Sequence, residues 1–170
     1  MSQQFEQAIL PHLDAAYNLA RWLVRSPADA DDVVQESFLR ALRFFDGFRG
    51  GDSRAWILKI VRNTCYSWVR KNRPTDLAEE FDETIHSGEG SAQDAEGMLV
   101  LRAESERMRK ALEALPVTFR EVLVLREIEE LSYKEICDVT AMPMGTVMSS
   151  LSRARRRLRE QLETGTRSEA

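Results

Sequence analysis

Apolar residues recur at spacings of three and four along most of the chain, whereas the strict alternation typical of half-buried strands is almost absent. Residues at these spacings share one face of a helix, with polar residues on the opposite face. Long stretches are also rich in Ala, Leu, Arg and Glu, which favour helix. The pattern predicts an all-α protein made of two small helical domains.

Two helices are predicted before residue 46. The first covers residues 5–24, with irregular opening turns at Pro11, whose ring removes a backbone hydrogen-bond donor. The second begins after Ser26, a favourable cap, and Pro27, which fits the first helical position. The side chains expected to point inward are Ile9, Leu13, Ala16, Tyr17, Ala20 and either Leu23 or Val24 in the first helix, and Val34, Phe38, Leu42 and Phe45 in the second.

A loop at residues 46–53 precedes a third helix. Three glycines within five positions would each cost a helix about 1 kcal/mol relative to alanine, so the second helix should end there. Asp52 or Ser53 is predicted to cap the third helix, which covers residues 54–72 and ends before Pro74. Its expected inward side chains are Ile57, Ile60, Val61, Thr64 and Trp68.

Helical periodicity is lost at residues 75–103, which are acidic and contain Gly and Ser. Such a composition cannot bury enough apolar surface to fold, so we interpret it as an extended, mobile linker. The linker would join a domain at residues 1–74 to a domain at residues 104–163. A disordered tail is expected at residues 164–170.

The net charge of −4 is unevenly distributed. Residues 76–106 carry 1 basic and 10 acidic side chains, net −9, whereas residues 1–75 have a net charge of +3 and residues 107–170 of +2. The acidic middle would repel DNA, but the two mildly basic ends are compatible with a nucleic-acid partner.

Four helices are predicted in the second domain. Apolar residues at helical spacing resume near residue 98 and stop at Pro116. Thr118 and Glu121 have the spacing of a capping box, in which each side chain bonds a backbone N–H of the first turn. This capping box would open a helix that leads into residues 131–162, where the remaining two helices are expected.

The segment at residues 131–162 has the pattern of a helix-turn-helix. A capping box formed by Ser132 and Glu135 opens a short helix, and Pro143 with Gly145 marks a tight turn. The long helix that follows is expected to start near residue 146 and to bury Val147, Leu151, Ala154, Leu158 and Leu162.

The opposite face of the long helix carries hydroxyls followed by arginines, namely Thr146, Ser149, Ser152, Arg153 and Arg156. In a helix-turn-helix the second helix lies in the major groove, where hydroxyls reach base edges and arginines reach phosphates or guanine. The alternative is a helical hairpin whose arginines are only solvated. The turn and the caps favour the interpretation as a DNA reader.

The helix at residues 54–72 and its end present a second basic face, formed by Lys59, Arg62, Asn63, Tyr66, Arg70 and Arg73. Cations interleaved with an aromatic ring can hold a phosphate backbone and stack against bases. A basic helix that is only solvated is the alternative. The adjacent loop, which would expose Phe48 and Arg49, and the helix-turn-helix in the same chain both favour contact with nucleic acid.

No catalytic or metal site is expected. His12 and His86 are the only histidines, and neither a Ser/His/Asp set nor a phosphate-binding glycine motif is apparent at usable spacing. Cys65 and Cys137 lie in amphipathic patterns without a ligand partner, so buried thiols in a reducing compartment are predicted, with a thiol sensor as the alternative. Without a signal segment or a long apolar run, neither export nor membrane insertion is expected.

Three segments in order resemble the extracytoplasmic-function sigma factors, the smallest type of bacterial sigma subunit. DADDVVQESFLRALRFF at residues 29–45 and RAWILKIVRNTCYSWVRKNRP at residues 54–74 are similar to the family's polymerase-binding and promoter-melting segments. The third segment, residues 115–162, is similar to the family's promoter-reading domain and reads LPVTFREVLVLREIEELSYKEICDVTAMPMGTVMSSLSRARRRLREQL.

The resemblance implies a polymerase contact in the first domain. The side chains that would dock on the clamp helices of the largest polymerase subunit are Asp31, Asp32, Gln35 and Glu36. The two aspartates also suit the positive end of a helix dipole, and the two roles are compatible.

The resemblance also implies two promoter contacts. A base flipped out of the minus-ten element, at a cost in unstacking energy, would be held by the loop that contains Phe48, Arg49, Asp52 and Ser53. The duplex edge and the melted strand would face Lys59, Arg62, Asn63, Tyr66, Arg70 and Arg73. The minus-thirty-five element would be read by Pro143, Met144, Thr146, Met148, Ser149, Ser152, Arg153 and Arg156.

Two positions depart from the family pattern. Met148 and Ser150 stand where a lysine and an arginine are frequent, so the start of the long helix should hold phosphates less strongly. Cys137 stands where alanine is usual, which exchanges one small residue for another.

The expected partners are core RNA polymerase, promoter DNA in duplex and melted form, and a cognate anti-sigma factor, with no cofactor. The chain would act in the cytoplasm, or be held at the inner membrane by its anti-sigma factor. Two alternatives stay open at this point. One is a stand-alone helix-turn-helix regulator, and the other is a sigma-like decoy that binds an anti-sigma factor without touching DNA.

Overall fold

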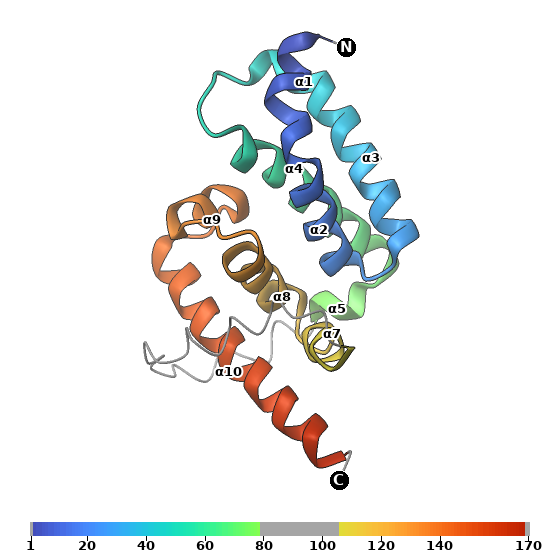
Figure 1. Cartoon of the computed structure of the whole chain (residues 1–170), viewed down its shortest axis with the longest axis vertical. Coiled ribbons are helices and arrows are strands. Elements are labelled where there is room, and N and C mark those ends of the chain that lie inside the picture. Colours follow the sequence, from blue (N-terminus) through green and yellow to red (C-terminus); the bar gives the residue numbers. More distant parts are fainter. Residues whose placement is uncertain (1, 79–105, 169–170) are drawn as a thin grey trace.

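The computed structural model describes residues 2–78 and 106–168, and every regular element in these ranges is helical (Figure 1). The all-α prediction is therefore confirmed. The α-helices are α1 Gln3–Ile9, α2 Leu13–Val24, α3 Pro27–Phe44, α4 Ser53–Asn72, α5 Pro74–Ala78, α7 Glu106–Glu113, α8 Val117–Leu123, α9 Tyr133–Thr140 and α10 Met144–Ser168. The expectation of a mobile linker falls on residues that lie mostly outside the described ranges, and its first residues belong to α5.

The first predicted helix is divided in two. Ser2 caps α1 by accepting a hydrogen bond from the backbone N–H of Phe5, and a 3₁₀ turn at Leu10–His12 separates α1 from α2. The 3₁₀ turn contains Pro11, which cannot donate to the helical ladder, and its tighter winding shifts the helical phase. As a result Leu13 is 43% exposed, so its predicted inward position is wrong, and Leu19 is fully buried.

Ser26 caps α3 as predicted, with its hydroxyl 3.4 Å from the backbone nitrogen of Asp29. The predicted apolar stripe is only partly right, because Leu42 is 39% exposed and Phe45 lies beyond α3 in a 3₁₀ turn. The face that is buried consists mainly of small or branched residues, namely Ala30, Val33, Val34, Ser37 and Ala41. Small side chains let α3 lie close to its neighbours, so the larger side chains fall to the edges of the contact.

Aromatic rings hold the loop between α3 and α4. Phe45 stacks on Phe48 with ring centroids 5.7 Å apart, and Phe48 lies 5.1 Å from Trp56. Phe5 of α1 contacts Phe45 edge to face at 5.3 Å. Phe48 is therefore half-buried in this cluster and not exposed as predicted.

The helix-turn-helix forms as predicted. Ser132 and Glu135 make both hydrogen bonds of the capping box, and Ala141 ends α9 in the left-handed conformation with φ 63°. Pro143 then leads into α10, which starts at residue 144, close to the expected position. Gly145, which was expected in the turn, instead lies in the first turn of α10. The predicted buried face is confirmed at Val147, Leu151, Ala154 and Leu158, whereas Leu162 is only partly buried. α10 continues to Ser168, so most of the expected tail is helical.

The predicted capping box of Thr118 and Glu121 is wrong. α8 begins directly after Pro116 and has no side-chain cap, since Pro116 already sets the chain direction into the first turn. Glu121 instead lies in the middle of α8, fully buried, with its carboxylate directed at α4. A short π-helical turn at Val124–Ile128 follows α8. A short loop at residues 129–132 then connects it to α9.

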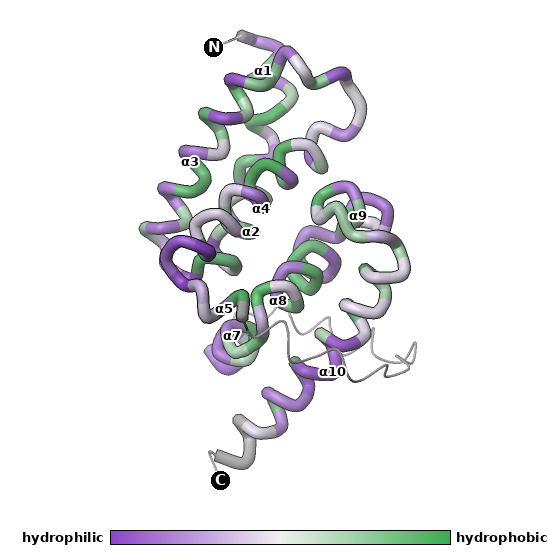
Figure 2. Tube along the Cα trace, turned by 180° about the vertical axis from the view of Figure 1, so that it is seen from behind, coloured by the Kyte–Doolittle hydropathy of each residue, from purple (hydrophilic) through white to green (hydrophobic). Residues whose placement is uncertain are grey.

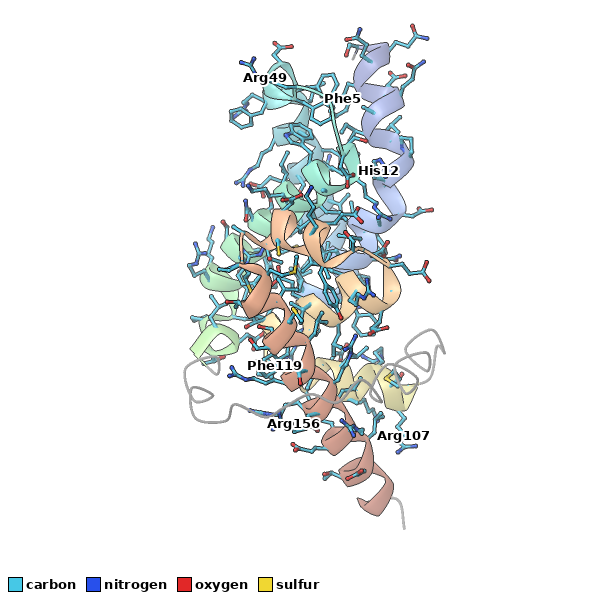
Figure 3. The ribbon with its side chains drawn as sticks, turned by 90° about the vertical axis from the view of Figure 1, so that its left-hand side faces the viewer. Phe5, His12, Arg49, Arg107, Phe119 and Arg156 are labelled. Carbon is cyan, nitrogen blue, oxygen red and sulfur yellow. The ribbon has the colours of Figure 1, made fainter. Side chains whose placement is uncertain are left out.

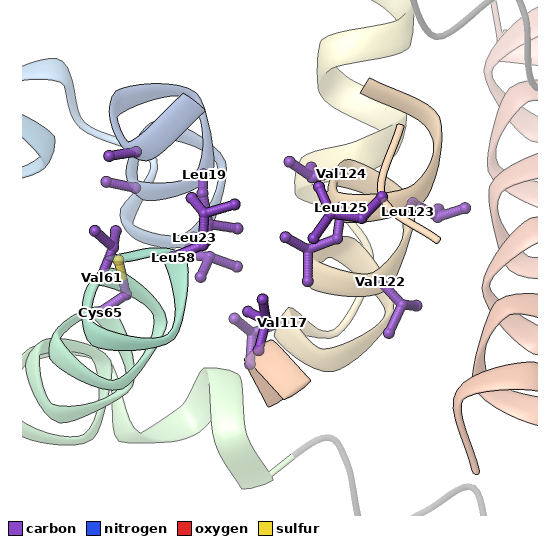
Figure 4. Close-up of a cluster of buried hydrophobic side chains, with 14 of the residues drawn as sticks. Leu19, Leu23, Leu58, Val61, Cys65, Val117, Val122, Leu123, Val124 and Leu125 are labelled. Carbon is purple, nitrogen blue, oxygen red and sulfur yellow. The ribbon is translucent and has the colours of Figure 1, made fainter. Parts of the chain in front are cut away.

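The two domains pack against each other along α2 and α4 on one side and α8 and α9 on the other (Figure 1). The apolar centre of this contact brings together Leu19, Leu23 and Leu58 with Val117, Val124 and Leu125 (Figure 4). Figure 2 shows the contrast between α8, which is largely apolar, and the hydrophilic C-terminal part of α10. The buried residues of both domains thus form one continuous core.

Candidate polymerase and DNA interfaces

The acidic face of α3 is open to solvent. All four of its predicted polymerase-binding side chains are exposed, namely Asp31, Asp32, Gln35 and Glu36. Their positions in the first three turns follow from the Ser26 cap, which fixes where α3 begins. Glu36 makes an ion pair of 2.6 Å with Arg40 one turn along, and Asp31 also lines a hollow with Tyr17 and Val34.

The loop before α4 contains two glycines and ends in a helix cap. Gly50 and Gly51 have φ values of 86° and 91°, a region that other residues rarely adopt. The carboxylate of Asp52 accepts a hydrogen bond of 3.1 Å from the backbone N–H of Ala55, so Asp52 rather than Ser53 caps α4. This bond occupies one carboxylate oxygen of Asp52 in capping α4.

Ser53 contacts a histidine from the 3₁₀ turn between α1 and α2. Its hydroxyl lies 3.1 Å from Nε2 of His12. Burial, followed by the nearby Arg54, lowers the pKa of His12, which favours the neutral ring. Arg49, in contrast, is exposed on the loop (Figure 3). Of the four loop residues expected to hold a flipped base, Arg49 and Asp52 are exposed, whereas Phe48 and Ser53 are half-buried.

The predicted basic face of α4 is divided between solvent and the other domain. Lys59, Asn63 and Arg70 are exposed as expected. Arg62 is half-buried and Tyr66 is only 7% exposed, so the prediction that they lie on one open face with the others is wrong. Both side chains are directed at α8.

Arg62 and Tyr66 bind the same carboxylate. Nε of Arg62 donates to one oxygen of Glu121 at 2.6 Å, and the hydroxyl of Tyr66 donates to the other oxygen at 2.6 Å. The guanidinium of Arg62 also lies over the Tyr66 ring, 3.9 Å from its centroid. Burial by itself would lower the pKa of Arg62, but the adjacent Glu121 carboxylate outweighs it and raises the pKa. We call Arg62, Tyr66 and Glu121 the carboxylate clasp.

Further polar contacts surround the apolar centre of the domain contact. Arg54 makes an ion pair of 2.9 Å with Glu135 of the second domain, and the Asn18 amide donates to Glu129 at 3.1 Å. Arg120 is fully buried and donates to backbone carbonyls of both domains. Burial, and then the nearby charge of another arginine, lowers the pKa of Arg120 to about 10. The domain contact is thus specific as well as apolar.

The predicted DNA face of α10 is accessible at its start. Pro143, Met144, Thr146, Met148 and Ser149 are all exposed, and Arg153 and Arg156 are half-exposed (Figure 3 labels Arg156). Ser152 differs, because its hydroxyl oxygen is buried and has no hydrogen-bond partner among the described residues. We therefore find Ser152 turned away from the face that the other residues share.

The remaining sequence expectations concern the thiols and metals. Cys65 is buried, and burial raises the pKa of its thiol, whereas Cys137 is only half-buried. Within residues 2–78 and 106–168, no cluster of three His, Cys, Asp or Glu side chains is arranged to hold a metal ion. No helix in these ranges is both long and apolar enough to cross a bilayer. His86 lies outside the described residues.

Sequence reasoning missed the residues of the domain contact. A signal was present, since Arg120 and Glu121 interrupt a stretch from Phe119 to Leu125 that is otherwise apolar. Adjacent charges in such a run are seldom buried unless they are paired. The sequence could therefore have indicated a buried polar contact at this place, but not the partners on α4.

Comparisons with known proteins agree with this architecture. Residues 8–75 match Sigma-70 region 2, and residues 105–158 match Sigma-70 region 4. The chain is 32% identical over 167 residues to the RNA polymerase sigma-H factor of Pseudomonas aeruginosa, covering 94% of this chain and 86% of that one. It is 31% identical over 161 residues to the ECF RNA polymerase sigma factor SigE of Mycolicibacterium smegmatis, covering 93% of this chain but 61% of the relative.

Solved structures resemble the whole arrangement. The sigma factor RpoE of Bartonella quintana, in complex with the anti-sigma factor NepR, has a TM-score of 0.72 at 28% identity, covering 95% of this chain and 98% of that one. CnrH, in complex with the cytosolic domain of CnrY, has a TM-score of 0.67 at 26% identity, covering 96% and 90%. The order of the two matched regions, the helical fold and the relatives lead to one conclusion. This chain belongs to the extracytoplasmic-function family of RNA polymerase sigma factors.

Proposed function

We propose that this chain is a dissociable subunit that gives core RNA polymerase its promoter specificity and that has no catalytic activity of its own. The observation that carries the proposal is the presence, in one chain, of matches to regions 2 and 4 in that order. The open acidic face of α3 and the open start of α10 support it, because each offers a surface to a macromolecular partner. The chain would act in the cytoplasm, where core polymerase is found.

The polymerase contact would use the four exposed side chains of α3. Asp31, Asp32, Gln35 and Glu36 lie within two turns, so they can meet one surface together. Charge reversal by Asp32→Lys should abolish holoenzyme assembly in a pull-down with core polymerase. The matched control is Glu160→Lys, since Glu160 is an exposed acid on α10, far from this face.

The minus-ten contact would use α4 and the loop before it. Lys59, Asn63 and Arg70 are already exposed, whereas Arg62 and Tyr66 hold Glu121 in the carboxylate clasp. A DNA phosphate and the Glu121 carboxylate are both anions, so they compete for the same donors. We infer that α8 must leave α4 before the promoter can be melted, and we call the described form, with the clasp made, the closed form.

Core polymerase would favour the open form and an anti-sigma factor the closed form. Both solved neighbours are complexes with another protein, which is an anti-sigma factor in the case of RpoE, and their similarity extends over nearly the full length of this chain. A partner that binds one form more tightly than the other shifts the equilibrium towards that form, by as much as its affinities for the two forms differ. An anti-sigma factor that contacts both domains would therefore hold the chain inactive. If that anti-sigma factor is anchored in the inner membrane, it would also keep the chain there.

The minus-thirty-five contact would use α10 in the major groove. Its start is exposed in the closed form, and Arg153 and Arg156 follow on the same side of the helix. The recognition helix can thus approach a duplex before the domains separate.

Transcription from a promoter library tests the proposal. Purified chain, core polymerase and genomic fragments should yield specific transcripts that core polymerase alone does not produce. The proposal fails if the chain binds polymerase and no fragment is transcribed, which is the outcome expected of a decoy. Tight binding of an operator by the free chain, with no effect on polymerase, would instead favour a stand-alone regulator.

A further inference from the structure

The start of the recognition helix contains no side chain that can read a purine with two hydrogen bonds. From Ala141 to Ser152 the sequence is AMPMGTVMSSLS, without Arg, Lys, Asn, Gln, Asp, Glu or His. Guanine is usually identified in the major groove by Arg or Lys, and adenine by Asn or Gln. The residues that reach deepest in a helix-turn-helix are those at the start of the second helix. A different kind of base contact is therefore needed here.

Two methionines dominate this part of the surface. Met144 is 43% exposed and Met148 is 53% exposed. They are four residues apart, so they lie on one face of α10, one turn from each other. The core does not require them, because Val147 and Leu151 already fill the buried face. Large apolar side chains that are left in water on a DNA-facing helix indicate an apolar contact.

The neighbouring hydroxyls are less available. Ser149 donates its hydroxyl to the backbone carbonyl of Thr146 at 3.2 Å, and the hydroxyl oxygen of Ser152 is buried. Apolar groups recognise one feature of the major groove, the C5-methyl group of thymine. The flexible thioether of methionine can adapt to such a small target.

We propose that Met144 and Met148 read thymine methyl groups in the minus-thirty-five element. This inference rests on the proposed function, in which α10 enters the major groove. Arg153 and Arg156 would supply the phosphate contacts one to three turns further along, which set the position of the helix without reading sequence. Specificity at the upstream element would then come from methyl groups rather than from purine hydrogen bonds.

Deoxyuridine substitution tests this directly, because uracil lacks the C5-methyl group and keeps the base-pairing edge of thymine. Holoenzyme is assembled on an active promoter from the library, and each thymine of the minus-thirty-five element is replaced in turn, on either strand. Loss of one buried methyl contact should weaken promoter binding about fourfold. Deoxyuridine in the spacer serves as the DNA control and should have no effect.

Variants of the two methionines test which side chain contacts which thymine methyl group. Met148→Ala should weaken binding to the thymine promoter and abolish the thymine-to-uracil difference at one position, while Met148→Leu should retain that difference. Met144→Ala should act in the same way at a neighbouring position. Position-specific loss of the difference cannot arise from a general effect on folding, so it distinguishes readout from stability.

The outcomes separate this inference from the proposed function. An active promoter that responds to no deoxyuridine in the upstream element overturns the methyl readout and leaves the sigma function intact. Absence of any active promoter instead contradicts the sigma function itself. If Met148→Ala leaves transcription unchanged and abolishes binding of a purified anti-sigma factor, the methionines form a protein-binding surface and the inference is wrong.

Discussion

The two surfaces that are expected to contact promoter DNA differ in how far the closed form exposes them. On α4, Arg62 and Tyr66 are held by a buried carboxylate from the other domain. At the start of α10, Met144, Thr146 and Met148 are exposed to solvent. The same chain therefore offers its duplex-reading surface and withholds part of its melting surface. Domain packing, rather than residue composition, therefore decides which of the two surfaces is available to DNA.

The largest effect is expected from Arg62→Ala. The variant leaves Glu121 buried without its cation, which should destabilise the closed form by about 3–5 kcal/mol. Urea unfolding measured by circular dichroism gives the change. The matched control is Lys59→Ala, which removes an exposed cation of the same helix and should change stability by less than about 0.5 kcal/mol.

A double variant sharpens this prediction. Adding Glu121→Leu to Arg62→Ala removes the buried charge together with its partner, so much of the lost stability should return. If the single and double variants are equally unstable, the ion pair does not hold the domains together. The clasp would then be a consequence of the apolar packing and not one of its causes.

Tyr66→Phe should have an intermediate effect. It removes one hydrogen bond to a buried carboxylate and leaves the ring in place, at a cost of about 1.5–3 kcal/mol to the closed form. The control is Tyr133→Phe, in a ring that stacks against Arg126 and lies outside the clasp. Faster hydrogen exchange along α8 in Tyr66→Phe, and not in Tyr133→Phe, would locate the effect at the domain contact. Equal exchange in both variants would contradict it.

Glu135→Gln should have a smaller effect, because its partner Arg54 is one-third exposed. Glutamine can still accept the backbone hydrogen bond of the capping box, so only the ion pair weakens, at a cost of about 0.5–1 kcal/mol. Hydrogen bonding by the Ser132 backbone, and then by Arg54, lowers the pKa of Glu135 to about 2. A carboxyl with a lowered pKa stabilises the fold above its ordinary value of 4.5, and this contribution is lost as the pH falls towards 2.

The pH dependence provides the measurement for this pair. Stability of the natural chain should fall between pH 4.5 and pH 2 by more than that of Glu135→Gln, which has no carboxyl at this position. Parallel curves for the two proteins would mean that Glu135 does not couple the domains to pH.

The smallest effect on the closed form is expected from Arg156→Ala. Arg156 lies on α10, away from the clasp, so unfolding should change by less than about 0.5 kcal/mol. Promoter binding by holoenzyme should nevertheless weaken, with a shallower salt dependence, because one phosphate contact is lost. A variant with normal binding at all salt concentrations would remove Arg156 from the DNA interface.

Much of the fold could be predicted because local rules decide it. The caps at Ser26 and Ser132, the loop glycines and the helical spacing of Val147, Leu151 and their neighbours depend on short stretches of sequence. The exposure of the α3 acids could be predicted in the same way, because they fall between the apolar positions of the helical pattern. The errors arose where local and tertiary effects compete. Thr118 and Glu121 have the spacing of a capping box, yet the buried contact with α4 takes the carboxylate.

The candidate site was predicted in part for a related reason. Spacing placed Lys59, Arg62 and Tyr66 on one side of a helix, but it could not tell whether that side meets water or another domain. The partner lies more than fifty residues away along the chain, beyond the reach of any helical pattern. A contact of this kind becomes visible only when the helices are placed in space.

A pair of spin labels shows whether the domains separate when the promoter is engaged. Cysteines are introduced at Ser67 of α4 and Asp138 of α9, which are both exposed, in a chain with Cys137→Ala. Cys65 can stay, because burial raises its pKa and keeps it unreactive. Double electron–electron resonance then measures the distance between the two spin labels in the free chain and in the open promoter complex.

A single distance is expected in the free chain and a clearly longer one in the open complex. Glu121→Gln should move part of the free population to the longer distance, because a neutral amide holds Arg62 less strongly. An unchanged distance in a complex that melts the promoter would rule out domain separation, since Arg62 and Tyr66 would then still be facing Glu121.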